Sequence, residues 1–273
     1  MRKIEDLIYT EDSGPPLALD LYLPDRVESA LPVVLCITGG GWYLCDRSLI
    51  DPFLADEGFA VASPTYRTSE EALAPANVYD CRAALRWLRA HASEFGLDPK
   101  RVGIWGQSAG GHLGALLALT PGLKELEGDR GNPGQSTDVQ ALCVFYAPMD
   151  LTRLAEPTLM KAFPVLYDAV ERYLGGPPGE HLELARLVSP MQYRMEHGPP
   201  TLIVHGESDS TVSFEESVRL HEALQQAGVD SLLRIFKGQE HGFNPPDLAN
   251  DEVRQFFVRT LSSVSSEPVE VSR

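Results

Sequence analysis

Short apolar runs that alternate with helical patterns are the feature that most constrains the fold of this chain. Residues 31–37 (LPVVLCI), 139–148 and 200–206 are apolar runs of strand length, typical of strands buried on both faces of a sheet. Residues 76–95 and 213–228 place apolar side chains at helical spacing. Strands alternating with helices predict an α/β fold: a mostly parallel sheet with right-handed crossovers and helices on both faces.

The other expected elements bring the sheet to about eight strands. Strands are expected at 4–9, 17–23, 60–67, from 101 and at 231–238, and helices near 48–57, 112–120 and 248–263. Residues 151–198 interrupt the alternation, with a helix expected near 161–174, and we expect them to form a short cap at the carboxyl edge of the strands. We expect one domain over residues 1–273, with 264–273 as a polar tail outside the fold.

Residues 106–110 read Gly-Gln-Ser-Ala-Gly, a G-x-S-x-G pattern. The pattern follows the strand expected from 101 and precedes the helix expected at 112–120, which is the context that a nucleophile elbow requires. The two glycines give a tight turn room, and the helix N-terminus can stabilise negative charge beside Ser108. We therefore expect Ser108 to be a catalytic nucleophile.

A serine nucleophile needs a base, and two histidines compete for that role. His241 lies on a glycine-flanked loop after the last expected strand, where ligands approach sheets of this kind. His205 continues a buried strand, which favours a hydrogen-bonded structural role, and His112 is expected to pack against the elbow. We expect His241 to be the base.

The base needs a carboxylate that orients it. Asp209 follows the strand at 200–206 and precedes His241, so the chain order is serine, aspartate, histidine, the order that this fold class uses. Glu207 and Asp150 also lie near carboxyl ends of expected strands and remain alternatives. We expect Asp209 to be the acid.

Three consecutive glycines, residues 39–41, follow the strand at 31–37. Glycines let backbone N–H groups approach a substrate oxygen without obstruction by side chains. We expect the amides of Gly40, Gly41 and Ala109 to form an oxyanion hole. A phosphate-binding loop is disfavoured because no Lys-Ser/Thr pair follows the glycines.

Together these residues resemble the α/β-hydrolase superfamily. The resemblance spans about residues 15–260 and is carried by TGGGW (38–42), the stretch 66–119, HGESDSTV (205–212) and GQEHGF (238–243). It is closest to hormone-sensitive-lipase-like esterases and the related small feruloyl and acetylxylan esterases. The resemblance implies hydrolysis of carboxylic esters by Ser108, His241 and Asp209, without a cofactor or metal.

The substrate is less well defined by the sequence. Esters of short-chain acyl groups, including acetyl groups on sugars, are the leading expectation, and feruloyl esters are a further candidate. Trp42, Tyr43 and Phe243 are candidates for a substrate pocket. One alternative is an amidase similar to kynurenine formamidase. Another is a hydrolase-fold protein that only binds, although such relatives typically lose a triad residue.

The net charge limits which partners the protein can bind, and the cysteines indicate the compartment in which it functions. Lys and Arg number 23 against 39 Asp and Glu, a net charge of −16, which disfavours nucleic acids and anionic membrane surfaces. Acidic residues interrupt the N-terminus before any secretory signal could form. The four cysteines include no CxxC motif, so we expect buried free thiols and a cytoplasmic protein. The sequence does not define an oligomeric state.

One position departs from the family pattern: Thr38 stands where the resemblance implies a histidine that holds the oxyanion loop. Threonine can form hydrogen bonds but has a shorter reach, so we expect an altered loop that retains activity. Thr38→His should therefore change kcat/KM for at least one ester in a panel of acyl lengths. An unchanged kcat/KM for every ester would contradict this role.

Overall fold

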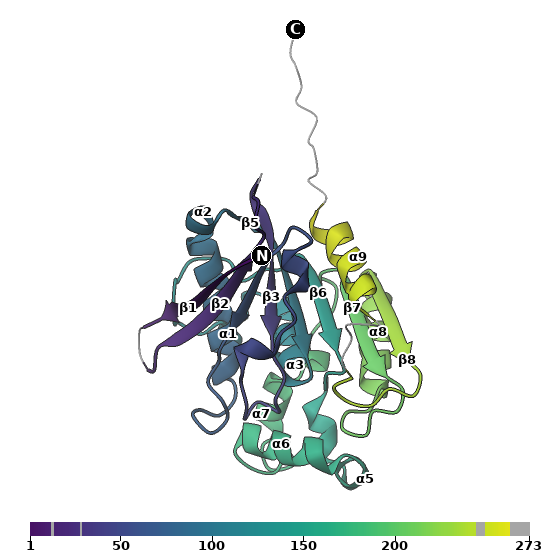
Figure 1. The fold of residues 1–273 in the computed structure, drawn as a ribbon. Coiled ribbons are helices and arrows are strands. Elements are labelled where there is room, and N and C mark those ends of the chain that lie inside the picture. The colour runs from purple at the N-terminus through teal and green to yellow at the C-terminus, as the bar shows by residue number, and fades with distance from the viewer. Residues whose placement is uncertain (12–13, 28, 244–248, 263–273) are drawn as a thin grey trace.

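The computed structural model describes residues 1–11, 14–27, 29–243 and 249–262, and a single eight-stranded sheet lies at its centre (Figure 1). Its strands are β1 (Arg2–Thr10), β2 (Leu17–Leu23), β3 (Leu31–Ile37), β4 (Ala60–Pro64), β5 (Leu97–Gln107), β6 (Ala141–Phe145), β7 (Thr201–Gly206) and β8 (Ser231–Phe236). The spatial order is β1-β2-β4-β3-β5-β6-β7-β8. The pairs β1–β2 and β2–β4 are antiparallel and the others are parallel. The expected α/β fold is confirmed.

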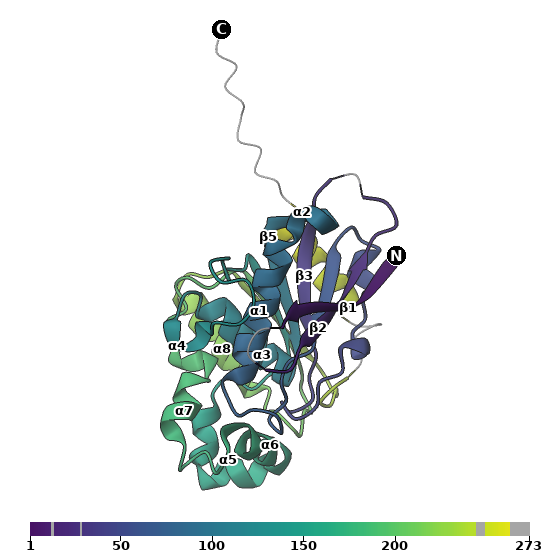
Figure 2. The ribbon, with the colours of Figure 1, turned by 90° about the vertical axis from the view of Figure 1, so that its left-hand side faces the viewer.

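Helices cover both faces of the sheet (Figure 2). One face packs against α1 (Ala76–Ala90), α3 (Ala109–Leu119) and α8 (Glu215–Gln226), and the other packs against α9 (Asn250–Leu261). Successive side chains of a strand point to opposite faces. Along β3, Val33 and Leu35 therefore enter the first core, while Val34 and Cys36 enter the second. Burial on both faces explains why this strand is apolar throughout.

The prediction of a helix at 48–57 is wrong. Two short 3₁₀ turns lie there instead, η1 (Arg47–Leu49) and η2 (Phe53–Ala55). Pro52 has no N–H to donate, and its ring disfavours the α conformation at Asp51. A continuous helix therefore cannot form across this segment.

Two other expected helices are each divided. The stretch 76–95 forms α1 and the short α2 (Ala92–Phe95), which ends at Gly96 in a left-handed conformation. The stretch near 161–174 forms α5 (Pro157–Ala162) and α6 (Pro164–Leu174). Pro164 is tolerated at the start of α6 but cannot continue α5, so the chain breaks between them.

Residues 151–198, which we call the cap segment, lie at the end of the molecule toward which the parallel strands point (Figure 1). Besides α5 and α6 they contain η3 (Leu151–Ala155), α7 (Leu182–Leu187) and η4 (Pro190–Gln192). A further short helix, α4 (Lys124–Glu127), lies outside the cap segment and precedes β6.

Other expectations concern the membrane, the thiols and the tail. No described helix is both long and apolar enough to span a membrane. All four cysteines are free thiols, and Cys36, Cys81 and Cys143 are buried. The tail expected at 264–273 lies outside the described residues.

A buried ion cluster joins α1 to the chain that leaves β4. The carboxylate of Asp80 is fully buried and accepts hydrogen bonds from the Arg67 backbone N–H (2.9 Å), Nε (2.9 Å) and Nη2 (2.8 Å). Arg130 Nη1 lies 3.3 Å from the same carboxylate. A buried charge that keeps several charge-assisted hydrogen bonds is stable, whereas removing one partner leaves the others uncompensated.

We therefore expect Asp80→Ala to lower the free energy of unfolding by about 3–5 kcal/mol, because two guanidinium groups lose their buried counter-charge. Urea denaturation followed by circular dichroism measures this change. Glu183→Ala is the matched control, because it breaks an exposed ion pair with Arg186 and should have a much smaller effect. Equal losses from both substitutions would contradict the role assigned to the Asp80 cluster.

Candidate active site

Ser108 lies on a strained turn between β5 and α3. Its φ of +51° and ψ of −121° are uncommon for a residue with a side chain. The turn is tight because a Cβ added at Gly106 would lie 2.3 Å from the Gly110 carbonyl oxygen, and one at Gly110 would lie 2.1 Å from the Ile37 carbonyl oxygen. Only glycine fits at either position, so the two glycines of the sequence motif are required by backbone packing.

Three residues from separate loops form a chain of hydrogen bonds beyond the carboxyl ends of the strands. Ser108 follows β5, Asp209 follows β7 and His241 follows β8. The Nε2 atom of His241 lies 3.0 Å from the Ser108 Oγ, and its Nδ1 atom lies 2.7 Å from the Asp209 Oδ2. The structure thus brings together the three residues that sequence analysis selected, although 133 positions separate Ser108 from His241.

The carboxylate of Asp209 is fully buried and all its partners donate to it. Its Oδ1 accepts from the backbone N–H groups of Thr211 and Val212, each at 2.8 Å, and its Oδ2 accepts from His205 Nε2 at 3.1 Å as well as from His241. Burial opposes ionisation, but the hydrogen bonds from His205, His241 and Val212 prevail and hold the pKa of Asp209 well below its usual range.

This shift has a defined sign for stability. A carboxylate whose pKa is lowered by folding stabilises the native state above the ordinary pKa of an aspartate. That stabilisation is lost as the pH falls through the lowered pKa of Asp209. Asp209 therefore remains an anion, able to accept hydrogen bonds, throughout the neutral and mildly acidic range.

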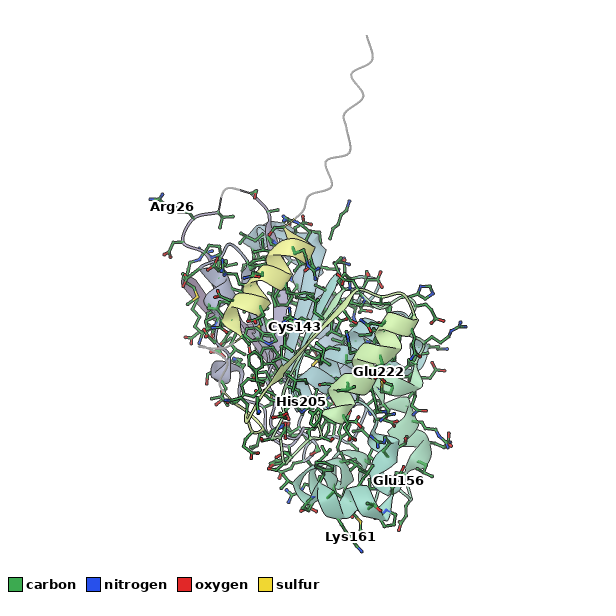
Figure 3. The ribbon with its side chains drawn as sticks, turned by 90° about the vertical axis from the view of Figure 1, so that its right-hand side faces the viewer. Arg26, Cys143, Glu156, Lys161, His205 and Glu222 are labelled. Carbon is green, nitrogen blue, oxygen red and sulfur yellow. The ribbon has the colours of Figure 1, made fainter. Side chains whose placement is uncertain are left out.

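The competing candidates form no hydrogen bond with Ser108 or His241 among the described residues. His205 is buried between the sheet and α8 (Figure 3), where its Nδ1 lies 2.7 Å from the Ser217 Oγ. Glu207 is exposed. Asp150, which immediately precedes the cap segment, interacts with Arg219 Nη2 of α8 at 3.1 Å. Sequence analysis predicted a hydrogen-bonded structural role for His205, but missed that this histidine donates to the same carboxylate as His241.

The glycine loop after β3 lies against the serine turn. A Cβ added at Gly39 would lie 3.2 Å from the Ser108 Cβ. Gly40 and Gly41 have φ values of +122° and +57°, and the Gly40 carbonyl accepts hydrogen bonds from the two residues that follow Trp42. Ala109 is the first residue of α3, where amide groups lack helical acceptors. No hydrogen bond between described residues uses the amides of Gly40, Gly41 or Ala109.

A cavity of about 670 Å³ opens in front of Ser108. The glycine loop forms one wall and the α6 helix of the cap segment forms another, through Val165, Leu166 and Ala169. Trp42 and Tyr43, two of the three candidates for a substrate pocket, line this cavity. Phe243 does not line it and instead packs against Tyr146 and Phe236, with ring centroids 5.6 Å away in each case.

Sequence analysis missed Tyr146 and Gln107, which also line the cavity. The Tyr146 ring packs edge-on against the His241 ring, with centroids 4.8 Å apart, and its hydroxyl donates to Gln107 Oε1 at 3.2 Å. Tyr146 directly follows β6, so its place at the carboxyl end of a strand was the available signal. Among the described residues, no group of three or more histidine, cysteine, aspartate or glutamate side chains is arranged to hold a metal ion.

Several known proteins are similar to this chain. The probable carboxylic ester hydrolase LipM of Mycobacterium tuberculosis is 33% identical over 202 residues, covering 71% of this chain and 45% of LipM. The isoprenylcysteine alpha-carbonyl methylesterase ICME of Arabidopsis thaliana is 30% identical over 236 residues, covering 83% of this chain and 54% of ICME. The chain thus spans about half the length of these relatives.

Solved structures of similar fold cover nearly the whole chain. A truncated carbohydrate esterase from gut microbiota superposes with a TM-score of 0.86 at 27% identity, covering 96% of this chain and 97% of that one. Esterase Est2 of Thermogutta terrifontis, with propionate bound, gives a TM-score of 0.74 at 28% identity, covering 93% and 92%. The BD-FAE family model matches residues 19–224. The resemblance expected from the sequence is confirmed: the chain has the α/β-hydrolase fold and belongs to the BD-FAE family.

Proposed function

We propose that this protein is a serine carboxylesterase that hydrolyses short-chain or acetyl esters through Ser108, His241 and Asp209. The observation that carries the proposal is the unbroken chain of hydrogen bonds from the Ser108 hydroxyl through His241 to Asp209, at the wall of the 670 Å³ cavity. Nucleophile, base and orienting acid are thereby within hydrogen-bond reach of one another. Similarity to proteins named as carboxylic ester hydrolases and esterases supports the same reaction class.

The reaction proceeds in two steps. His241 Nε2 takes the proton of Ser108 as its oxygen attacks the ester carbonyl carbon, and the resulting oxyanion accepts hydrogen bonds from the Gly40, Gly41 and Ala109 amides. The ester bond then breaks, and the alcohol leaves with the proton from His241. Water, deprotonated by His241, attacks the acyl-enzyme and releases the carboxylic acid and a regenerated Ser108. Asp209 holds the imidazole tautomer and stabilises the imidazolium in both steps.

The cavity supports a substrate with more than an acetyl group. A volume of about 670 Å³ lies within the range of sites that enclose a whole small ligand. The similarity to a carbohydrate esterase favours an acetylated or feruloylated sugar, with the acyl group at Ser108 and the sugar in the remaining space. The walls contain Asp46 and Asp51 and no lysine or arginine, among the described residues, so an anionic substrate is disfavoured.

We further propose that the chain acts as one domain in the cytoplasm, with the cap segment as part of the substrate cavity. Four free thiols favour a reducing compartment. Contacts of the cap segment support its role: α6 contributes Val165, Leu166 and Ala169 to the cavity wall.

Replacing the nucleophile tests the proposed function directly. Ser108→Ala should lower kcat for p-nitrophenyl acetate by about 10⁴-fold or more, because no acyl-enzyme can form. Ser210→Ala is the matched control: its hydroxyl bonds to Glu240, next to His241, and we expect a rate within threefold of the wild type. Equal rates for Ser108→Ala and the unaltered protein would show that Ser108 is not the nucleophile. The roles assigned to His241, Asp209 and the oxyanion amides would then fall as well.

Replacing Asp209 tests whether this residue sets the tautomer of the His241 imidazole. In Asp209→Asn the amide NH₂ would face His241 Nδ1, which must then accept, so the imidazole proton moves to Nε2 and blocks removal of the serine proton. We expect kcat for p-nitrophenyl acetate to fall by about 10⁴-fold with a modest change in KM. Circular dichroism checks that the fold persists. A fall below tenfold in a folded variant would show that Asp209 does not orient the base.

A further inference from the structure

Three segments that are distant in sequence meet at the buried side chain of His112. This residue lies on α3, where its backbone N–H donates to the Ser108 carbonyl at 3.0 Å. Its Nδ1 lies 3.2 Å from the indole Nε1 of Trp42, in the glycine loop, and its Nε2 lies 2.6 Å from the carbonyl oxygen of Val188, in the cap segment. One imidazole thus links the serine turn, the loop that carries Gly40 and Gly41, and the base of the cap segment.

The partners of His112 define its tautomer. A carbonyl oxygen only accepts hydrogen bonds, so Nε2 must carry the proton that is donated to Val188. An indole N–H only donates, so Nδ1 must be bare to accept from Trp42. Both ring nitrogens are satisfied only in the neutral imidazole. Burial agrees with this assignment, because it lowers the pKa of His112 to about 4.

Trp42 lies in a strained part of the loop. Gly41 and Trp42 both have positive φ values, +57° and +63°, and the second is unfavourable for a residue with a large side chain. Such a conformation persists only where the surroundings over-determine it. The indole is almost completely buried and stacks on Tyr173 of α6 with ring centroids 4.6 Å apart, and the Trp42 carbonyl accepts from the Ser69 N–H at 2.8 Å.

The rest of the glycine loop is held by backbone contacts. The hydroxyl of Tyr66 lies 3.1 Å from the Thr38 carbonyl and 3.3 Å from the Leu44 carbonyl, one on each side of the glycines. The side chain of Thr38 is buried but forms no hydrogen bond of ordinary geometry with another described residue. The Trp42 side chain therefore anchors the middle of the loop, and His112 is its polar partner.

We propose that His112 is a positioning residue that holds the amides of Gly40 and Gly41 in place opposite Ser108, acting through its hydrogen bond with Trp42. The role rests on the proposed esterase function, because it concerns the amides that would stabilise the oxyanion. His112 does not touch the substrate: it is fully buried and does not line the cavity. Its contribution is to keep the donors at the separation that the transition state requires.

The consequence is specific to the chemical step. A loop whose amides are displaced still admits an ester into the cavity, so KM changes little. The oxyanion forms only after attack by Ser108, so poorly placed donors lower kcat. A residue that merely contributes to stability would lower the amount of folded enzyme and leave the kinetic constants of the folded fraction unchanged.

Substitution of His112 by a polar side chain and, separately, by an apolar one tests the proposal. Glutamine can accept from Trp42 and donate to Val188, as the neutral imidazole does, whereas phenylalanine can do neither. For p-nitrophenyl acetate, we expect His112→Phe to lower kcat by about 10–100-fold with KM within threefold, and His112→Gln to restore kcat to within about fivefold of the wild type. Titration with a fluorophosphonate measures the concentration of active enzyme, so that each kcat refers to the active fraction alone.

Two further variants separate a local role from a general one. Trp42→Phe removes the indole donor and should resemble His112→Phe, and the double variant should be little worse than either single one, because both remove the same contact. His91→Phe is the matched control: His91 also contacts a tryptophan, here stacking on Trp87 with ring centroids 4.2 Å apart, but at the C-terminal end of α1, away from the cavity. We expect its kcat to be unchanged.

The outcomes are distinguishable. The proposal is overturned if His112→Phe keeps its kcat, if glutamine fails to restore the rate in a folded variant, or if the effects of His112→Phe and Trp42→Phe multiply. If His112→Phe does not fold, Trp42→Phe and His112→Gln still decide between these results. Failure of the proposed function looks different, because Ser108→Ala would then match the wild type in the same assay.

Discussion

The close approach of the turn between β5 and α3 to its neighbours is the constraint on which the rest of the site depends. A side chain at Gly106 or Gly110 would overlap backbone atoms, so strand and helix can pack this tightly only with glycine at both positions. This packing imposes a positive φ on Ser108 and directs the start of α3 toward the cavity. The same packing brings the glycine loop into contact with the serine, since Gly110 also lies against the end of β3.

Electrostatics at the site is organised around one buried anion. Asp209 accepts from two backbone amides and two histidines, and each hydrogen bond favours its ionised form over the neutral acid. His205 and His241 have different environments around this shared carboxylate. His205 is enclosed between the sheet and α8, whereas His241 retains an edge toward the cavity that contains Ser108. A histidine held at one nitrogen by an anion and facing a hydroxyl at the other is suited to proton transfer.

The cap segment is integrated with the site through buried polar contacts. Glu216 of α8 accepts from the backbone N–H groups of Met149 and Asp150, each at 3.0 Å, immediately before the cap segment begins. At the other end of the segment, Val188 accepts from His112. Both anchors connect the cap segment to helices that pack on the sheet. The cavity wall formed by α6 is therefore positioned by the same sheet and helices that carry Ser108.

The sequence by itself determined the α/β alternation, the turn at Ser108 and the choice of Asp209 and His241, because these depend on local patterns: strand-sized apolar runs, glycines two positions from a serine, and loops that follow strands. It failed for residues 48–57, where Pro52 overrides an apparent helical pattern. Only the tertiary structure decided that Phe243 packs away from the cavity, that His205 shares Asp209, and that His112 meets Trp42 and Val188. These contacts join segments from different parts of the chain, and the direction of each side chain depends on packing that no local pattern encodes.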